Sequence, residues 1–452
     1  MGANTRKKLL LSILLSLLLA VSAVSLNAQD DVIELDFVHI FSDDLRPVVI
    51  QGIIDEFQSQ NPGIVINSYS TNADSDYNEV FLSALDSADL GDAPNIVQVE
   101  ESLTQQAIDF GYFVPIDEVV TEEQMASLDD VLPTIREYYQ IGDNFWSMPW
   151  NVSNPIMYYN RDMFVAAGLD PDQPPRTFDE ILVACEAIMA GNPDLAACIN
   201  WPLSAWYVEQ WMAMQNELLL NNDNGRAARA TETFYNSEPM IEIVRWWDEL
   251  DANGYYSYTG RVGDDNGEGI AFLTQRTAMH LNSTAGLTLI QNFAEFDLGV
   301  APLPLPFEEA TNGVTVGGAS LWVMADQTEE EMQAAVDFIF FLTQTDNDIT
   351  WHKGTGYIPI RESSYQQLEA DGYYEENPFF LIAVNQFREA NANVATAGGV
   401  MGPAQLVRGH LLSTVQLLLD EELASDEELQ EVMDNAKTRA DEELQDYNRD
   451  FE

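Results

Sequence analysis

The sequence predicts an α/β protein built around parallel β-sheet, and three observations support this. Strand-like and helix-like patterns alternate along the chain, which is typical of a parallel sheet covered by helices. Hydrophobic residues make up 46% of the 452 residues, enough for a large core. No low-complexity linker divides the chain, although its length allows about two to four domains. Any two domains are therefore expected to be interwoven.

The first segment is expected to be removed before the protein folds. Three basic residues at positions 6–8 precede an apolar run over residues 9–24, and small residues follow. This pattern predicts a secretory signal peptide over residues 1–28, cleaved after Ala28, with Ala23 as the alternative. The apolar run is short for a membrane span, and no cysteine stands nearby to carry a lipid anchor. The mature protein is expected to be exported and soluble, in the periplasm or outside the cell.

The next hundred residues carry the clearest alternation. The expected elements are a strand over 32–40, a helix over 47–60, a strand over 64–69, a helix starting near 77 and a strand over 95–99. In the first helix, Val49, Ile50, Ile53, Ile54 and Phe57 recur at helical spacing. The turn sequence at 61–63, Asn-Pro-Gly, ends that helix.

The alternation continues to the C-terminus. A strand is expected over 156–159, an amphipathic helix over 178–190 and a glycine-rich strand over 314–324. Thr328 and Glu331 form a possible capping box for a helix that reaches Thr343. After Leu406 the chain is expected to be mostly helical.

The charge excludes one class of partner. The chain has 19 Lys and Arg against 75 Asp and Glu, a formal net charge of −56. Nonspecific nucleic-acid binding requires a basic surface, so no nucleic-acid partner is expected. Docking on anionic lipid is disfavoured for the same reason.

Common catalytic and metal-binding motifs are absent from the sequence. It has no P-loop, HExxH, CxxC or G-x-S-x-G pattern, and its four histidines lack metal-ligand spacing. The segment 264–268 is a poor fragment of a calcium loop. Neither a metal nor a cofactor is expected, and carboxylate pairs are too common here to indicate an enzyme. Cys185 and Cys198 form either a disulfide or a pair of buried thiols.

Aromatic residues, glycines and small polar residues concentrate in three segments. These are residues 148–160, 313–324 and 351–360. Aromatic faces pack on ligand carbons, hydroxyls orient oxygens, and glycines let backbone N–H groups approach a ligand. The clustering predicts a cleft for a small polar ligand.

Several of these runs also carry a family resemblance. They include GDAPNIVQVEE near residue 95, YYNRDMFVAAGLDPDQPPRTFDE over 158–180, SMPWNVSNP, VGGASLWVM and WHKGTGYIPI. Over essentially the whole mature chain the sequence resembles the extracellular solute-binding proteins (family 1) of ABC importers. It looks most like the members that bind sn-glycerol-3-phosphate.

The resemblance implies a two-lobed periplasmic-binding-protein fold of type II-like organisation, whose interwoven lobes close on a solute by hinge motion. It places hinge crossings near Ser153, Ser283 and Trp351. Lobe I is then expected over 29–152 and 284–350, and lobe II over 153–283 and 351–452.

The resemblance also implies a set of ligand-binding residues. In this role it implies Tyr77, Glu101, Ser153, Ser283, Gly318, Tyr357 and Arg408. Among them, Glu101 is expected to accept hydrogen bonds from glycerol hydroxyls, and Tyr357 and Arg408 to hold phosphate. Gly318 is expected to donate its backbone N–H. Trp201 and Trp206 are candidates for an aromatic platform.

The function expected on these grounds is a monomeric, non-enzymatic receptor. It would deliver glycerol-3-phosphate or a glycerophosphodiester to the membrane permease subunits of an ABC importer. A sugar or oligosaccharide receptor is the alternative of the same class. The alternatives of other classes are a secreted glycosidase or phosphatase that uses carboxylates, and a structural surface protein. A strongly acidic chain repels phosphate at long range, which a neutral sugar would avoid.

Overall fold

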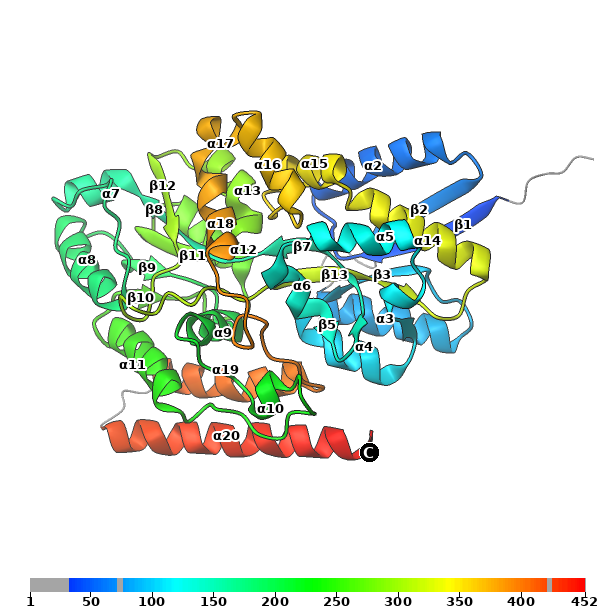
Figure 1. The fold of residues 1–452 in the computed structure, drawn as a ribbon. Helices are drawn as coiled ribbons and strands as arrows, with labels where there is room; N and C mark the ends of the chain where they lie inside the picture. The colour runs from blue at the N-terminus through cyan, green and yellow to red at the C-terminus, as the bar shows by residue number, and fades with distance from the viewer. Residues whose placement is uncertain (1–31, 71–75, 421–424, 452) are drawn as a thin grey trace, which may run out of the picture.

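The computed structural model describes residues 32–70, 76–420 and 425–451. The predicted signal peptide lies outside these residues. Figure 1 shows two α/β lobes side by side, each with its own sheet. No described helix combines the length and the apolar character that a membrane span requires.

The sheet of lobe I has the order β2-β1-β3-β13-β4, and β7 also pairs with β13. Its strands are β1 (Ile33–His39), β2 (Ile64–Ser70), β3 (Ile96–Glu100), β4 (Phe113–Val114), β7 (Met148–Ser153) and β13 (Gly317–Met324). β1 runs parallel to β2 and β3, which confirms the predicted parallel unit, whereas β13 is antiparallel to β3, β4 and β7.

Helices of lobe I cover this sheet because their apolar residues lie on one face. In α2 (Arg46–Gln60), Ile50, Ile53, Ile54 and Phe57 are the buried residues, as their spacing predicts. The Thr328 capping box is present at the start of α14 (Glu329–Leu342), and this helix packs against β1. The other elements are α3 (Tyr77–Asp89), η1 (Glu101–Leu103), α4 (Thr104–Phe110), η2 (Ile116–Glu118), α5 (Glu122–Ser127), η3 (Leu128–Asp130), α6 (Pro133–Tyr139), β5 (Gln140–Ile141), β6 (Asn144–Phe145) and α15 (Thr345–Thr355).

The sheet of lobe II has the order β10-β9-β11-β8-β12. Its strands are β8 (Pro155–Asn160), β9 (Ile199–Asn200), β10 (Tyr256–Ser257), β11 (Met279–Ser283) and β12 (Leu298–Pro302). Its helices and 3₁₀ turns are α7 (Arg161–Ala166), α8 (Phe178–Gly191), α9 (Ala205–Met214), α10 (Asn221–Asn224), α11 (Glu238–Ala252), α12 (Asp265–Leu273), η4 (Thr284–Gly286) and α13 (Leu287–Phe293). Helices α16 (Glu362–Ala370), α17 (Tyr373–Glu376), α18 (Pro378–Arg388), α19 (Ala404–Asp420) and α20 (Asp426–Arg449) complete the chain.

Cys185 and Cys198 form a disulfide, so the alternative of two buried thiols was wrong. The bridge joins α8 to the residue before β9, with 5.3 Å between the two Cα atoms. It ties a covering helix to the sheet of lobe II.

The crossings between the lobes differ in part from the expected ones. The chain passes from β7 in lobe I to β8 in lobe II through Asn154, as expected near Ser153. The expected return to lobe I at residue 284 was wrong, because β12 pairs with β8 and places Gly299 opposite Tyr159. The chain therefore reaches the first sheet only between Pro302 and Gly317.

The third crossing is also displaced from its expected position near Trp351. This residue lies inside α15, which packs against α2 of lobe I, and its ring stacks on Trp150 with 4.8 Å between centroids. Helix α18 packs against β12 of lobe II. The crossing therefore falls between α15 and α18, after Thr355 and before Pro378.

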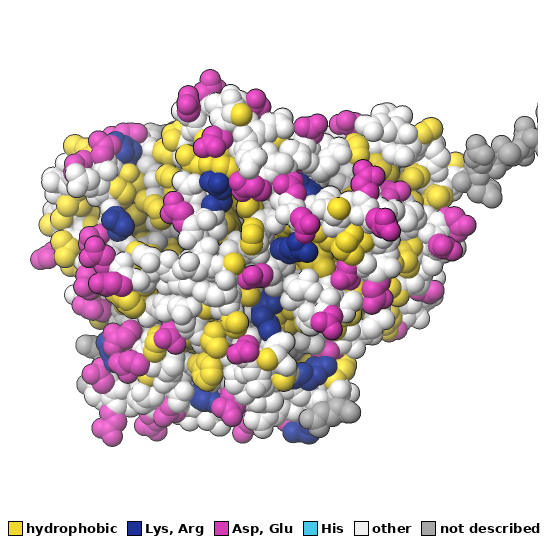
Figure 2. Space-filling view, in the orientation of Figure 1, with side chains coloured by type: hydrophobic (Ala, Val, Ile, Leu, Met, Phe, Trp, Pro, Cys, Tyr) yellow, Lys and Arg dark blue, Asp and Glu magenta, His cyan; other side chains and the backbone are white. Residues whose placement is uncertain are grey.

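Figure 2 shows acidic side chains spread over the visible face and few basic ones among them. Within the described part of the chain, no group of three or more His, Cys, Asp or Glu residues could hold a metal ion. Asp264, in the calcium-loop fragment, instead accepts a hydrogen bond from the Gly267 N–H and caps α12.

Candidate functional site

Four of the predicted residues lie around the first crossing. Ser153 ends β7 and lies opposite Gly317 in β13, and Gly318 lies opposite Val152. Ser283 ends β11 opposite Pro155, and the next N–H, of Thr284, donates to the Asn154 carbonyl over 2.9 Å. Strand ends of both lobes therefore meet at Asn154.

Tyr357 reaches the same place from the segment that follows α15. The N–H of the following residue, Ile358, donates to the Val152 carbonyl over 2.8 Å, beside Ser153. The preceding residue, Gly356, has a φ of +89°, and a β-carbon there would lie 2.9 Å from the Thr284 carbonyl oxygen. The Tyr357 ring stacks on Trp351 with 5.5 Å between centroids. The backbone thus fixes Tyr357 between the two strand-end serines.

Gly318 is required where it stands. Its φ is +105°, and a β-carbon would lie 2.1 Å from the Asn151 carbonyl oxygen. An L side chain there would be strained and would collide with backbone. The close approach of β13 to β7 depends on this glycine.

The two candidate platform tryptophans have different positions. Trp201 is fully buried and stacks on Trp246, so it belongs to the core of lobe II. Trp206, near the start of α9, lies against β13, since a β-carbon on Gly317 would lie 2.4 Å from its ring. Its indole nitrogen is buried and has no hydrogen-bond partner among the described residues. Of the two, only Trp206 lies beside the predicted site residues.

Tyr77, the first residue of α3, contacts β7 next to the first crossing and lies near two charged side chains. Its hydroxyl accepts a hydrogen bond from the Asn151 amide over 2.9 Å. It lies within electrostatic reach of Tyr357, Glu100 and Arg46. A basic side chain and an acidic one therefore both lie near this hydroxyl.

The basic side of the site is Arg46, at the start of α2. Its guanidinium carbon lies 5.6 Å from the centre of the Tyr357 ring and 5.4 Å from that of Phe41. One amino group pairs with Asp43 at 3.1 Å, and the other donates to the Ala285 carbonyl of lobe II over 3.2 Å. Its Nε is buried without a partner among the described residues.

The acidic side contains Glu101 and Arg408. Arg408 donates through Nε and Nη2 to the two carboxylate oxygens of Glu209, over 2.7 and 2.6 Å. Nη2 also lies 3.3 Å from Oε1 of Glu101, which follows β3 of lobe I. Arg408 and Glu209 belong to α19 and α9, which pack together, so the Glu101 contact joins the two lobes.

Burial dominates the electrostatics of this acidic side. Burial and the neighbouring Glu100 carboxylate raise the pKa of Glu101 well above its ordinary value, and its Oε2 is buried without a partner in the described residues. Burial opposes the charge of Arg408, but the Glu209 and Glu101 carboxylates outweigh it and raise the arginine pKa. An acceptor that lacks a donor in a buried site favours a hydroxyl-bearing ligand.

Sequence reasoning missed Glu209 and Arg46. Glu209 was detectable as the single charged residue in AWYVEQWMAM, since a charge on an otherwise apolar helix needs a partner. Arg46 was detectable as one of few basic residues, placed just after the first strand. Ligands of open α/β sheets bind at the carboxyl ends of strands.

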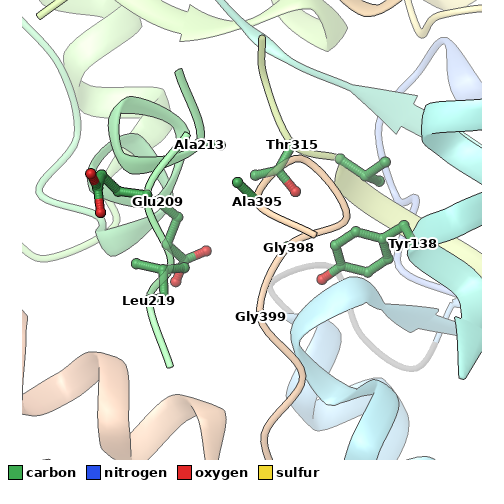
Figure 3. A pocket seen from close by; sticks show the side chains of 10 residues that line it. Tyr138, Glu209, Ala213, Leu219, Thr315, Ala395, Gly398 and Gly399 are labelled. Atoms are coloured by element: carbon green, nitrogen blue, oxygen red, sulfur yellow. The ribbon is translucent and has the colours of Figure 1, made fainter. Parts of the chain in front are cut away.

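Two hollows open in the surface of the described residues, and the smaller one borders the acidic side of the site at Glu209. A cavity of about 10 Å³ beside Glu209 is lined by Tyr138, Thr315 and Gly398, with Glu209 and Tyr138 on opposite sides (Figure 3). That volume holds about one water and no solute. A groove of about 1040 Å³ on lobe II is lined by parts of α8 and α18 and by residues 301–305. None of the predicted site residues lines either hollow.

Comparison with known proteins agrees with the fold and the resemblance. A family model described as "Bacterial extracellular solute-binding protein" matches residues 52–379. The chain is 28% identical over 410 residues to the sn-glycerol-3-phosphate-binding periplasmic protein UgpB of Escherichia coli, covering 89% of each chain.

Solved structures show the same two-lobed fold. UgpB from Mycobacterium tuberculosis in complex with glycerophosphocholine has a TM-score of 0.75 at 20% identity, covering 92% of this chain and 99% of that one. The cyclic alpha-maltosyl-1,6-maltose binding protein from Arthrobacter globiformis has a TM-score of 0.73 at 19% identity, with the same coverage of 92% and 99%. These two relatives share a scaffold and differ in the solute that their names give.

Proposed function

Because the chain belongs to the bacterial extracellular solute-binding proteins, we propose that it is the extracytoplasmic receptor of an ABC importer. It binds sn-glycerol-3-phosphate or a glycerophosphodiester between its lobes and delivers it to the membrane permease subunits. The receptor acts as a monomer and without catalysis. The cleft is lined by the strand-end and cleft residues expected from the sequence: Tyr77, Glu101, Ser153, Ser283, Gly318, Tyr357 and Arg408.

The observation that carries this proposal is the polarity of the residues around the crossing. One side holds a buried carboxylate, Glu101, with an unpaired oxygen that can accept a hydrogen bond from an alcohol. The other side holds the Tyr357 hydroxyl and two strand-end serines close to an arginine. A glycerol phosphate has the same two ends, hydroxyls and an anion. Similarity to UgpB over most of the chain supports the same ligand class.

A sugar receptor is the second candidate, and two observations favour it. Trp206 has an unpaired indole N–H beside β13, and aromatic rings commonly pack on sugar faces. The net charge of −56 also repels an anionic solute at long range. Screening at high salt reduces that repulsion to a few ångströms.

Isothermal titration calorimetry of the mature protein separates these candidates. The ligands are sn-glycerol-3-phosphate, glycerophosphocholine, maltose and free glycerol. Saturable one-to-one binding of a glycerophosphate is expected, and binding of maltose alone would make the sugar receptor the correct assignment.

Turnover assays on chromogenic phosphate esters and glycosides test the enzyme alternative. No turnover is expected, whereas hydrolysis that is lost in Glu101→Gln would show a carboxylate-based hydrolase. Sedimentation of the same sample tests the structural alternative, since a surface protein would self-assemble and bind no solute.

A further inference from the structure

Arg46 is the least satisfied arginine around the crossing. A guanidinium carries five N–H hydrogens. Among the described residues, Arg46 donates one to Asp43 and one to the Ala285 carbonyl, and its Nε donates to none. Three of its donor hydrogens therefore have no protein acceptor among the described residues, on a side chain that is 28% exposed beside Tyr357.

Arg408 stands in a different environment. Three of its hydrogen bonds go to the buried carboxylates of Glu209 and Glu101. The side chains of these three residues are 13%, 9% and 4% exposed. A phosphate at Arg408 would have to compete with the Glu209 carboxylate, whose two oxygens already accept the Nε and Nη2 hydrogens of Arg408.

The only carboxylate paired with Arg46 in the described residues is that of Asp43. The side chain of Asp43 is 37% exposed, so solvent screens its charge. The neighbours on the inner side are the rings of Phe41 and Tyr357 and the nearby Tyr77 hydroxyl. An anion there would meet a planar donor group and phenolic hydroxyls, the donor set that suits phosphate oxygens.

We propose that Arg46 is the cation of the anion-binding end of the cleft, which takes a phosphate monoester or diester together with Tyr357 and Tyr77. Arg408 instead holds Glu101 and Glu209 in place for the hydroxyl end. This assignment rests on the proposed function, and it names a ligand-binding residue that the sequence did not indicate. The bond from Arg46 to Ala285 also joins the two lobes. An anion bound at Arg46 therefore sits where both lobes meet.

The test measures sn-glycerol-3-phosphate binding by calorimetry in the parent protein and in three variants. Arg46→Gln removes the charge, Arg46→Lys keeps the charge without the planar fork, and Arg449→Gln is the matched control. Arg449 is a suitable control because its side chain is 65% exposed and pairs only with Asp446 among the described residues. Inorganic phosphate is the second probe, used as a competitor, and the unfolding temperature of each ligand-free variant checks the fold.

Arg46→Gln is expected to weaken glycerol-3-phosphate binding at least about 30-fold, the loss of charge-assisted hydrogen bonds from a side chain that is 28% exposed. Arg46→Lys is expected to lose about 3-fold to 30-fold, and Arg449→Gln less than 2-fold. The affinity of the parent should fall with added NaCl more steeply than that of Arg46→Gln.

Two results would overturn the assignment, and they can be told apart. If the parent binds glycerol-3-phosphate and both Arg46 variants bind it within about 3-fold, Arg46 is not the anion site, and the proposed function stands. If the parent binds no phosphate ester, both the proposed function and the role of Arg46 fail. If Arg46→Gln does not fold, the Arg46→Lys affinity decides, and a value equal to that of the parent overturns the proposal.

Discussion

Substitution of Asp109 by Ala should shift the receptor towards an open form. Asp109 lies on α4 of lobe I, and its carboxylate is 3% exposed. It accepts two hydrogen bonds from Arg229 and one from the Tyr447 hydroxyl, which lies 3.0 Å from Oδ2. Tyr447 lies near the end of α20, which packs on α19 and α11 of lobe II and reaches below α4 in Figure 1. The three residues form a latch between the lobes.

The size of the effect follows from the burial of the latch. Breaking a buried ion pair costs about 3–5 kcal/mol, and a neutral hydrogen bond about 1 kcal/mol. The Arg229 side chain is 33% exposed, so solvent screening lowers the cost of breaking this ion pair below the value for a fully buried one. We therefore expect a loss of about 2–3 kcal/mol from the closed form, or about a 30-fold to 150-fold loss of affinity.

Small-angle scattering and calorimetry measure this effect together. The ligand-free Asp109→Ala protein should have a larger radius of gyration than the parent, and saturating ligand should reduce that difference. Asp129→Ala is the matched control, since Asp129 pairs with Arg136 within lobe I and its side chain is 81% exposed. Reduced thermal stability of Asp109→Ala with unchanged radius and affinity would refute the latch and assign Asp109 a local packing role.

Three further predictions concern stability. Glu209→Gln leaves the buried Arg408 without its bidentate partner and should lower the free energy of unfolding by about 3 kcal/mol in urea denaturation; a change below about 0.5 kcal/mol would contradict this. Burial lowers the pKa of His280 from 6.5 to about 3, so between these values the unfolded chain takes up a proton that the folded chain does not. The buried neutral His280 therefore costs no stability above pH 6.5, and below that pH the free energy of unfolding falls by about 1.4 kcal/mol for each pH unit. His280→Gln should reduce the dependence of the unfolding temperature on pH, measured by thermal unfolding over this range. Removing the disulfide in the double variant Cys185→Ser, Cys198→Ser should cost about 3 kcal/mol, because the loop has a sequence separation of 13; equal unfolding temperatures of both proteins would show that the bridge adds nothing.

The sequence was most informative where contacts are local. The apolar spacing of α2, the turn after it and the Thr328 capping box depend on residues within a few positions of each other, and the structure has all three. The clustering of glycine with Tyr357 and the strand-end serines was also visible in the composition of short segments.

The boundaries of the lobes could not be obtained in this way. β12 is five residues long, and its assignment to lobe II depends on pairing with β8, which is distant in sequence. Trp351 is held against lobe I by its stacking on Trp150, again a contact between residues distant in sequence. Glu209 becomes part of the site only through Arg408 on another helix. Such pairings are set by tertiary packing, and no local pattern encodes them.

The position of β13 has a consequence for how the chain can be made. This strand pairs with β3, β4 and β7 in the sheet of lobe I, yet residues 317–324 follow every strand of lobe II. During synthesis, all strands of the lobe II sheet therefore emerge before β13, the strand that completes the lobe I sheet. Until then β3 and β7 keep unpaired edges, which are sites of aggregation. The sheet of lobe I therefore cannot be completed until residue 324 has emerged, so the two lobes are expected to finish folding together.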